Sequence, residues 1–154
     1  MKIYEEKCKR YLDSQNIHAE HLTFSQTCHS VEDAAKATNT SPEQFVKNIC
    51  MIDQNNNFIL AVVKGEDRAS TTRVGKALNI ERPRLATEQE VFKYTGYLTG
   101  GVPSFGYDAK FLIDPKVMEL DYIFTGGGSP HSLVKIKSED VLKMNEGQVT
   151  RIRK

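Results

Sequence analysis

The sequence has few cysteines, no long apolar segment and no excess of either charge, and each of these absences excludes a class of protein. Its three cysteines are widely spaced and form no C-x-x-C pair, which argues against a disulfide framework and against a zinc site. No apolar run approaches the roughly 20 residues that span a bilayer, and the N-terminus lacks the apolar core of a signal peptide. We therefore expect a soluble, cytoplasmic protein with no metal site and no membrane partner.

The net charge of +1 argues against a protein that binds nucleic acid mainly through a large positive net charge, but it leaves open a site for one end of an RNA. Locally, residues 64–84 hold six basic and three acidic residues, a distribution that we interpret as solvated surface. The length predicts one domain, residues 1–154, that is large enough to bury a core.

The common catalytic motifs are also missing. The chain contains no G-x-x-x-x-G-K-[ST], H-E-x-x-H or G-x-S-x-G motif, and its four histidines lack metal-ligand spacing. Cys28 and His29 are adjacent, but neighbours on a strand point apart, so we interpret this pair as incidental rather than as a nucleophile with its base.

Apolar periodicity, capping residues and turn residues predict alternating helices and strands, with a β-hairpin (45–53 and 58–65) at the centre of the sheet. Ser138 is predicted to cap the last helix, and Ser41 with Gln44 to form a capping box. Because the elements interleave without a regular βαβ repeat, we expect an α+β domain with a mixed sheet. The predicted helices are 2–14, 30–38, 41–44, 70–79, 87–96, 115–120 and 138–144, and the further strands are 21–24, 111–114, 122–125 and 132–136.

Three features carry candidate chemistry: Lys47 in a core strand, the loop GGVPSFG (Gly100–Gly106) and the loop GGGSPH (Gly126–His131). Each has a structural explanation when taken alone, since a strand lysine commonly points outward and glycine loops between strands are commonly turns. The second loop enters a strand rather than a helix, which removes the phosphate-binding mechanism of a helix N-terminus. Together, the three features suit a pocket walled by backbone N–H groups that holds a carbonyl, carboxylate or phosphate.

This combination resembles the YbaK family, which also occurs as the editing insertion of bacterial prolyl-tRNA synthetases. The resemblance covers nearly the whole chain and is carried by FVKNICMID with its lysine, DRASTTRVGKAL, TGYLTGGVPSFG, FLID and the G-x-x-x-P element at Gly126–Pro130. Ser104 departs from the pattern, because related sequences often read GGVPPFG or GGVSPFG. The resemblance implies a mixed, mostly antiparallel, barrel-like sheet surrounded by helices.

By the same resemblance, the chain is expected to hydrolyse mischarged aminoacyl-tRNA in trans through water attack on the ester, without a cofactor. Alanine or cysteine on proline tRNA is the first expectation, with serine or threonine next. The partners would be the 3′ acceptor end of the tRNA and, as a further candidate, prolyl-tRNA synthetase, but no DNA. The implied catalytic residues are Lys47, Gly126 and His131, and the implied substrate-binding residues are Gly100, Gly101, Pro103, Gly106, Gly127, Gly128, Ser129 and Pro130. Phe24, Cys28 and His29 are candidates for the pocket wall.

In these roles, Lys47 would act as a point charge on a phosphate or on the aminoacyl end, the glycine loop would hold the ester and the water, and His131 would shape the pocket or assist proton transfer. Two other hypotheses remain open. In the first, the protein is an enzyme whose Lys47, if its amine were desolvated, forms a Schiff base with a small carbonyl compound. The chain would otherwise be a non-catalytic adaptor that binds tRNA ends or a synthetase.

Overall fold

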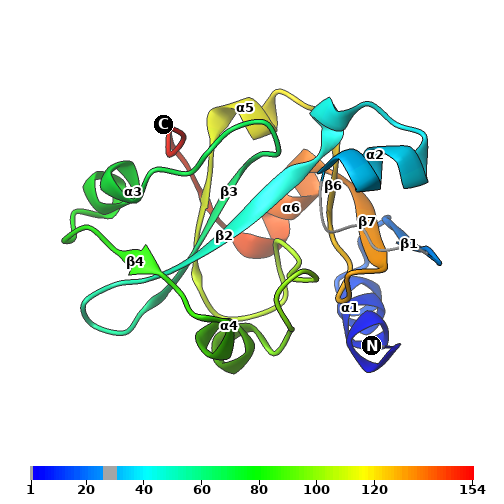
Figure 1. The fold of residues 1–154 in the computed structure, drawn as a ribbon, viewed down its shortest axis with the longest axis horizontal. Helices are drawn as coiled ribbons and strands as arrows, with labels where there is room; N and C mark the ends of the chain where they lie inside the picture. Colours follow the sequence, from blue (N-terminus) through cyan, green and yellow to red (C-terminus); the bar gives the residue numbers. More distant parts are fainter. Residues whose placement is uncertain (1, 26–30) are drawn as a thin grey trace.

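A computed structural model describes residues 2–25 and 31–154, and its strands form two sheets with helices packed around them (Figure 1). The helices are α1 (Lys2–Ser14), α2 (Val31–Thr38), the 3₁₀-helix η1 (Pro42–Gln44), α3 (Thr71–Leu78), α4 (Glu88–Thr95), α5 (Pro115–Met118) and α6 (Ser138–Asn145). The strands are β1 (Glu20–Thr23), β2 (Val46–Ile52), β3 (Phe58–Lys64), β4 (Arg84–Leu85), β5 (Lys110–Ile113), β6 (Tyr122–Gly126), β7 (Ser132–Lys137) and β8 (Gln148–Val149).

The larger sheet has the strand order β4-β2-β3-β5-β8, and the smaller sheet has the order β1-β7-β6. Four of the six strand pairs are antiparallel, while β3–β5 and β5–β8 are parallel. A parallel bridge between Phe45 and Phe124 connects the two sheets. The predicted α+β class with mixed, mostly antiparallel strands is therefore confirmed, with the strands divided between two sheets.

The β2–β3 hairpin forms the centre of the molecule, as predicted. Its turn is fixed by Asp53, whose carboxylate accepts hydrogen bonds from the backbone N–H groups of Asn55 and Asn57 at 2.8 Å each. Strand β3 is buried on both faces. Leu60 packs into a cluster with α1, α4 and β5, whereas Ala61 packs on the other face against a cluster below α3.

A third cluster lies between α2 and the smaller sheet, where Ala34 and Leu133 pack with the stacked rings of Phe45 and Phe124. The two sheets also share the first cluster, in which Leu60 of β3 packs with Ile123 of β6 and Val134 of β7. Within the described residues, no helix is long and apolar enough to cross a membrane.

Of the two capping predictions, the one for Ser138 is wrong, and the one for Ser41 is confirmed for the cap itself but not for the capping box with Gln44. Ser138 is the first residue of α6 rather than its cap, because its hydroxyl donates to the carbonyl of Leu120 instead of accepting from the helix. Ser41 does accept from Glu43, but the helix is a single 3₁₀ turn, and the buried side-chain oxygen of Gln44 has no hydrogen-bond partner among the described residues. Ser30, the first residue of the predicted helix 30–38, lies outside the described residues.

Candidate functional site

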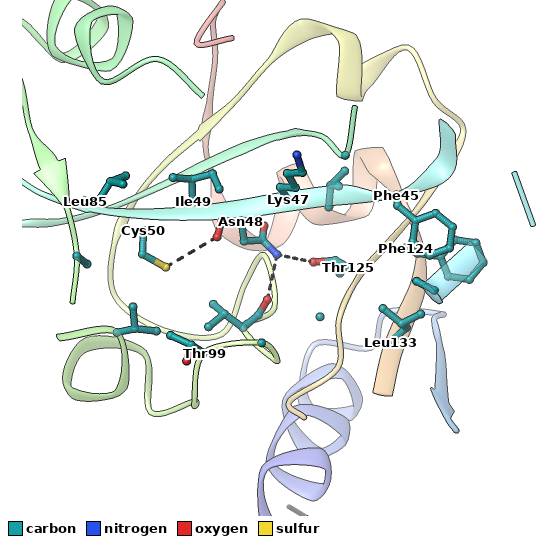
Figure 2. A pocket seen from close by; sticks show the side chains of 18 of the residues that line it. Phe45, Lys47, Asn48, Ile49, Cys50, Leu85, Thr99, Phe124, Thr125 and Leu133 are labelled. Atoms are coloured by element: carbon teal, nitrogen blue, oxygen red, sulfur yellow. Dashed lines mark hydrogen bonds between the residues drawn. The ribbon is translucent and has the colours of Figure 1, made fainter. Parts of the chain in front are cut away.

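A cavity of about 790 Å³ lies along the unpaired edge of β2, between the two sheets (Figure 2). Strand β4 pairs with β2 only at Met51 and Ile52, and this contact is extended by a hydrogen bond from the N–H of Ala86 to the carbonyl of Cys50 (2.9 Å). At the other end, the Phe45–Phe124 bridge closes the gap. Between these two contacts, no described strand pairs with this edge of β2.

The backbone of Asn48 faces this open edge. The N–H of Gly65 donates to the carbonyl of Phe45 on the β3 side (2.7 Å), whereas the carbonyl of Cys50 accepts on the β4 side. Hydrogen-bonding direction alternates along an antiparallel strand, so Asn48 points its N–H and C=O in the same direction as Cys50. The cavity is therefore bordered by main-chain groups that a ligand can reach.

The cavity walls are mostly apolar, with a small polar set of side chains. Such a combination is typical of small-molecule sites, where a few polar groups fix orientation. Its described apolar lining residues are Ala34, Phe45, Val46, Ile49, Cys50, Leu85, Ala86, Val91, Val102, Phe124 and Leu133, and its polar or glycine lining residues are Glu32, Lys47, Asn48, Gly65, Thr99, Gly100, Thr125 and Gly126.

One side of the cavity, which we call its floor, contains a ring of hydrogen bonds between Asn48, Ser104 and Thr125. The amide nitrogen of Asn48 donates to Thr125 Oγ1 (2.9 Å) and to the carbonyl of Val102 (3.0 Å), as Figure 2 shows. Ser104 Oγ lies 2.6 Å from Asn48 Oδ1 and 2.7 Å from Thr125 Oγ1. The ring joins β2, β6 and the loop after α4.

Counting protons settles the direction of each of these bonds. Asn48 Oδ1 is only an acceptor, so the single hydroxyl proton of Ser104 must go to it, and Thr125 must then donate to Ser104. Both amide protons of Asn48 are used as well. Every donor proton of the ring is therefore in use, including the one that Asn48 gives to Val102. Thr125 is buried, whereas Asn48 is half-buried and lines the cavity, so Asn48 keeps an oxygen lone pair for a ligand group that donates a hydrogen bond.

The two predicted glycine loops lie back to back behind this floor. The N–H of Gly128 donates to the carbonyl of Gly101 (2.8 Å). A Cβ on Gly126 would lie 2.3 Å from the carbonyl oxygen of Val102, a distance that no side chain tolerates. Gly128 has φ +108° and packs on the backbone of Tyr4 in α1. These glycines are thus needed for close approach of main chain to main chain.

Helix α1 also holds the second loop through a side chain. The hydroxyl of Ser129 donates to the carboxylate of Glu5 at 2.7 Å, and it accepts from the N–H of His131 at 3.1 Å. Ser129 is buried, and its N–H donates to Ser132 Oγ (3.0 Å). The loop is therefore fixed from within and from α1.

Lys47 borders the cavity, but its amine lies on the face of β2 opposite the polar floor. Figure 2 shows Lys47 and Asn48 on opposite sides of the strand, as the alternation of strand side chains requires. The Lys47 amine is 3.4 Å from the carbonyl oxygen of Asp67. Lys47 is therefore placed to meet a ligand at the rim rather than on the floor.

Of the predicted site residues, Lys47, Gly100 and Gly126 line the cavity. The other eight, listed next, belong to the two loops and are not among its described lining residues: Gly101, Pro103, Gly106, Gly127, Gly128, Ser129, Pro130 and His131. The carbonyl of His131 accepts from the N–H of Phe24 (2.8 Å), and Phe24 itself packs in the cluster below α2. Cys28 and His29 lie outside the described residues.

Thiol and metal chemistry find no support in the described part of the chain. Burial raises the pKa of the Cys50 thiol to about 12, so this thiol, the one among the described residues that borders the cavity, stays protonated and is a poor nucleophile. No group of three His, Cys, Asp or Glu side chains in residues 2–25 and 31–154 could hold a metal ion.

Sequence reasoning missed Asn48, Thr125 and Glu32 as parts of the site. Asn48 could have been identified, because Lys47 and Asn48 are the two polar residues of a mostly apolar strand and adjacent strand residues point to opposite faces. Thr125 directly precedes the glycine loop. Glu32 is an exposed acid in the first turn of α2, and such residues are common at helix starts, so nothing marked it as a lining residue.

Comparison with known proteins gives a consistent family and fold. A model of the aminoacyl-tRNA editing domain matches residues 25–144. The uncharacterised YwhH of Bacillus subtilis is 22% identical over 82% of this chain and 81% of its own length. The multifunctional Ser/Thr-tRNA deacylase ProXp-y of Escherichia coli K12 is 25% identical over 69% of this chain and 66% of its own length.

A proline–tRNA ligase of Limosilactobacillus reuteri is 30% identical over 60% of this chain, but the matched part spans only 17% of that ligase. Among solved structures, a candidate trans-editing enzyme for prolyl tRNA synthetase superposes with a TM-score of 0.90 at 21% identity. That match covers 98% of this chain and 97% of the other, and it shows that the two share a fold.

Proposed function

The chain belongs to the aminoacyl-tRNA editing domain family, and on that premise we propose that it hydrolyses mischarged aminoacyl-tRNA in trans, as one domain over residues 1–154. Water adds to the ester carbonyl, the bond from that carbon to the ribose oxygen breaks, and the ribose oxygen takes the proton. The products are a free amino acid and a tRNA with an intact terminal ribose. The reaction needs no cofactor and would take place in the cytoplasm, where aminoacyl-tRNA is used.

The observation that carries this proposal is the cavity at the open edge of β2. Its volume of about 790 Å³ suits an amino acid joined to a nucleoside better than a free amino acid alone. The free oxygen lone pair of Asn48 can accept a hydrogen bond from the substrate amino group. The described lining contains no ionised thiol, so a positioned water and the labile ester together account for the chemistry.

The roles of the remaining residues follow from their positions. Gly126 and Gly100 would place main-chain groups beside the ester. Lys47, at the rim, would bind a phosphate of the terminal nucleotides as a point charge. His131 is the last residue of the loop and is not among the described lining residues, so it would act by shaping the loop rather than by touching the ester.

The amino acid removed would be small. The nearby walls are formed by Phe45, Phe124 and Leu133, and an apolar wall separates side chains that differ by one methylene by only about 1–3 kcal/mol. We propose alanine or cysteine on proline tRNA first, and serine or threonine next.

The test is a panel of alanyl-, cysteinyl-, seryl- and threonyl-tRNA, each followed for loss of the ester with wild type and with Lys47→Ala. We expect at least one substrate to be hydrolysed by wild type, and Lys47→Ala to raise KM more than it lowers kcat. If wild type binds tRNA but leaves all four esters intact, the protein is a non-catalytic adaptor for tRNA ends or for prolyl-tRNA synthetase. Equal rates of hydrolysis by Lys47→Ala and wild type would show that Lys47 has no role in binding or catalysis.

A further inference from the structure

The near-zero net charge conceals a strong separation of charge along the chain. Residues 68–84 and 148–154 hold eight of the 21 Lys and Arg residues but only one of the 20 Asp and Glu residues. The rest of the chain therefore carries 13 basic and 19 acidic residues. Such a separation creates a positive field at one surface even in a nearly neutral protein.

The structure brings these two segments together. The C-terminal residues form a bridge between Arg153 and Ala69, and the N–H of Lys154 donates to the carbonyl of Arg68 (2.8 Å). Ile152 is buried in the cluster below α3, so the chain end is held against that helix. In Figure 1, α3 and the C-terminus lie on the same side of the molecule. We call this region the α3 surface; its exposed basic residues are Arg68, Arg73, Lys76, Arg82, Arg151 and Lys154.

Among the described residues, the six basic residues of the α3 surface are not held in ion pairs, although Glu81 is exposed in the same segment. Two other arginines of the same segments, Arg84 and Arg153, form ion pairs with Glu90 (2.8 Å) and Asp114 (2.9 Å). By contrast, none of the six residues of the α3 surface forms an ion pair with an acid in the part of the chain that the structure describes. Like charges held together repel one another, so this arrangement favours binding of an anionic partner.

The α3 surface begins at the rim of the cavity. The Lys47 amine contacts the carbonyl of Asp67, the residue before Arg68. Ile49 borders the cavity and also packs against the cluster below α3. Leu85, another lining residue, directly follows Arg84. A polyanion whose end enters the cavity would therefore pass Lys47 and continue over α3.

We propose that the α3 surface binds the phosphate backbone of the tRNA acceptor stem while the aminoacylated 3′ end occupies the cavity. This inference rests on the proposed function for the identity of the RNA. Duplex RNA suits the surface because it is recognised mainly through phosphates and shape, and scattered Arg and Lys side chains provide such contacts without reading sequence.

The experiment compares two triple variants with the same change in charge. Arg73→Gln/Lys76→Gln/Arg151→Gln removes three charges from the α3 surface, and Lys2→Gln/Arg10→Gln/Lys143→Gln removes three exposed charges on α1 and α6. Binding of uncharged tRNA is measured between low and moderate salt. Each lost phosphate contact lowers the slope of log K against log salt by about 0.9, so the α3 variant should lose about 2–3 in slope and the control almost nothing.

The same variants are then assayed for ester hydrolysis. With full-length aminoacyl-tRNA, the α3 variant should show a KM about tenfold higher and an unchanged kcat, whereas an aminoacyl ester of the terminal adenosine alone should be hydrolysed as by wild type. Equal salt slopes for the two variants would overturn the proposal, and so would loss of binding to prolyl-tRNA synthetase with tRNA binding intact. If wild type hydrolyses no ester but the slopes still differ, the proposed function fails while the RNA-binding surface stands.

Discussion

Replacing Ser104 by alanine tests whether the polar ring on the cavity floor stabilises the protein. The change leaves Asn48 Oδ1 without its donor and the buried hydroxyl of Thr125 without its acceptor. A buried polar group that loses its partner costs about 1–3 kcal/mol. Because Asn48 borders the cavity, water can replace part of its lost bond, and so we expect a total loss of about 2 kcal/mol. For a chain of this size, that loss lowers Tm by about 4–8 °C.

The measurement is urea unfolding together with a thermal melt, and Ser14→Ala is the matched control. Ser14 is exposed and donates only to the carbonyl of Tyr11, so its removal should change stability by less than about 0.5 kcal/mol. In a double-mutant cycle with Thr125→Val, Ser104→Ala should show a coupling energy of about 0.5–3 kcal/mol. A Ser104→Ala protein as stable as the control, or strictly additive effects in the cycle, would refute the ring as a stabilising unit.

Two further predictions concern carboxylates: Glu5, which binds the glycine loop, and Asp114, which binds the C-terminal residues. Glu5→Ala should lower the kcat of ester hydrolysis several-fold, because Ser129 loses its acceptor and the glycine loop shifts, whereas Glu5→Gln should restore the rate and the exposed Glu6→Ala should have no effect. Unchanged kinetics for Glu5→Ala would contradict this role. Asp114→Asn should cost about 2–4 kcal/mol at pH 7 in urea unfolding. Although burial alone would raise the pKa of Asp114, backbone hydrogen bonds and then the charge of Arg153 lower it. The stabilisation by Asp114 should therefore be complete above about pH 4 and disappear as pH falls through the lowered pKa; a pH-independent difference from wild type would contradict it.

The central hairpin was predictable because its signals are local. Apolar runs on both sides of an asparagine-rich turn identify two strands, and a second strand that is apolar up to Lys64 identifies burial on both faces. By contrast, β4 and β8 are two residues long and owe their existence to pairing partners, so no pattern in their own sequence predicts them.

The candidate site was only partly predictable, because its contacts join distant residues. Lys47 and the glycine loops could be singled out by residue type and place in the chain. The bonds of Ser104 to Asn48 and to Thr125 span 56 and 21 residues, and that of Ser129 to Glu5 spans 124. The position of Lys47 relative to the cavity also depends on which edge of β2 remains unpaired. The pairing of the whole sheet decides which edge that is.

The unpaired edge of β2 has a consequence for solubility and self-association. An open strand edge is a template on which another chain can add a strand, and this is a common origin of aggregation. Here the open stretch lies between the Phe45–Phe124 bridge and the pairing with β4, so only a few residues are exposed, fewer than the five or six of an ordinary strand. The protein can therefore present main-chain groups to an extended ligand without offering a second copy of itself enough edge to pair with.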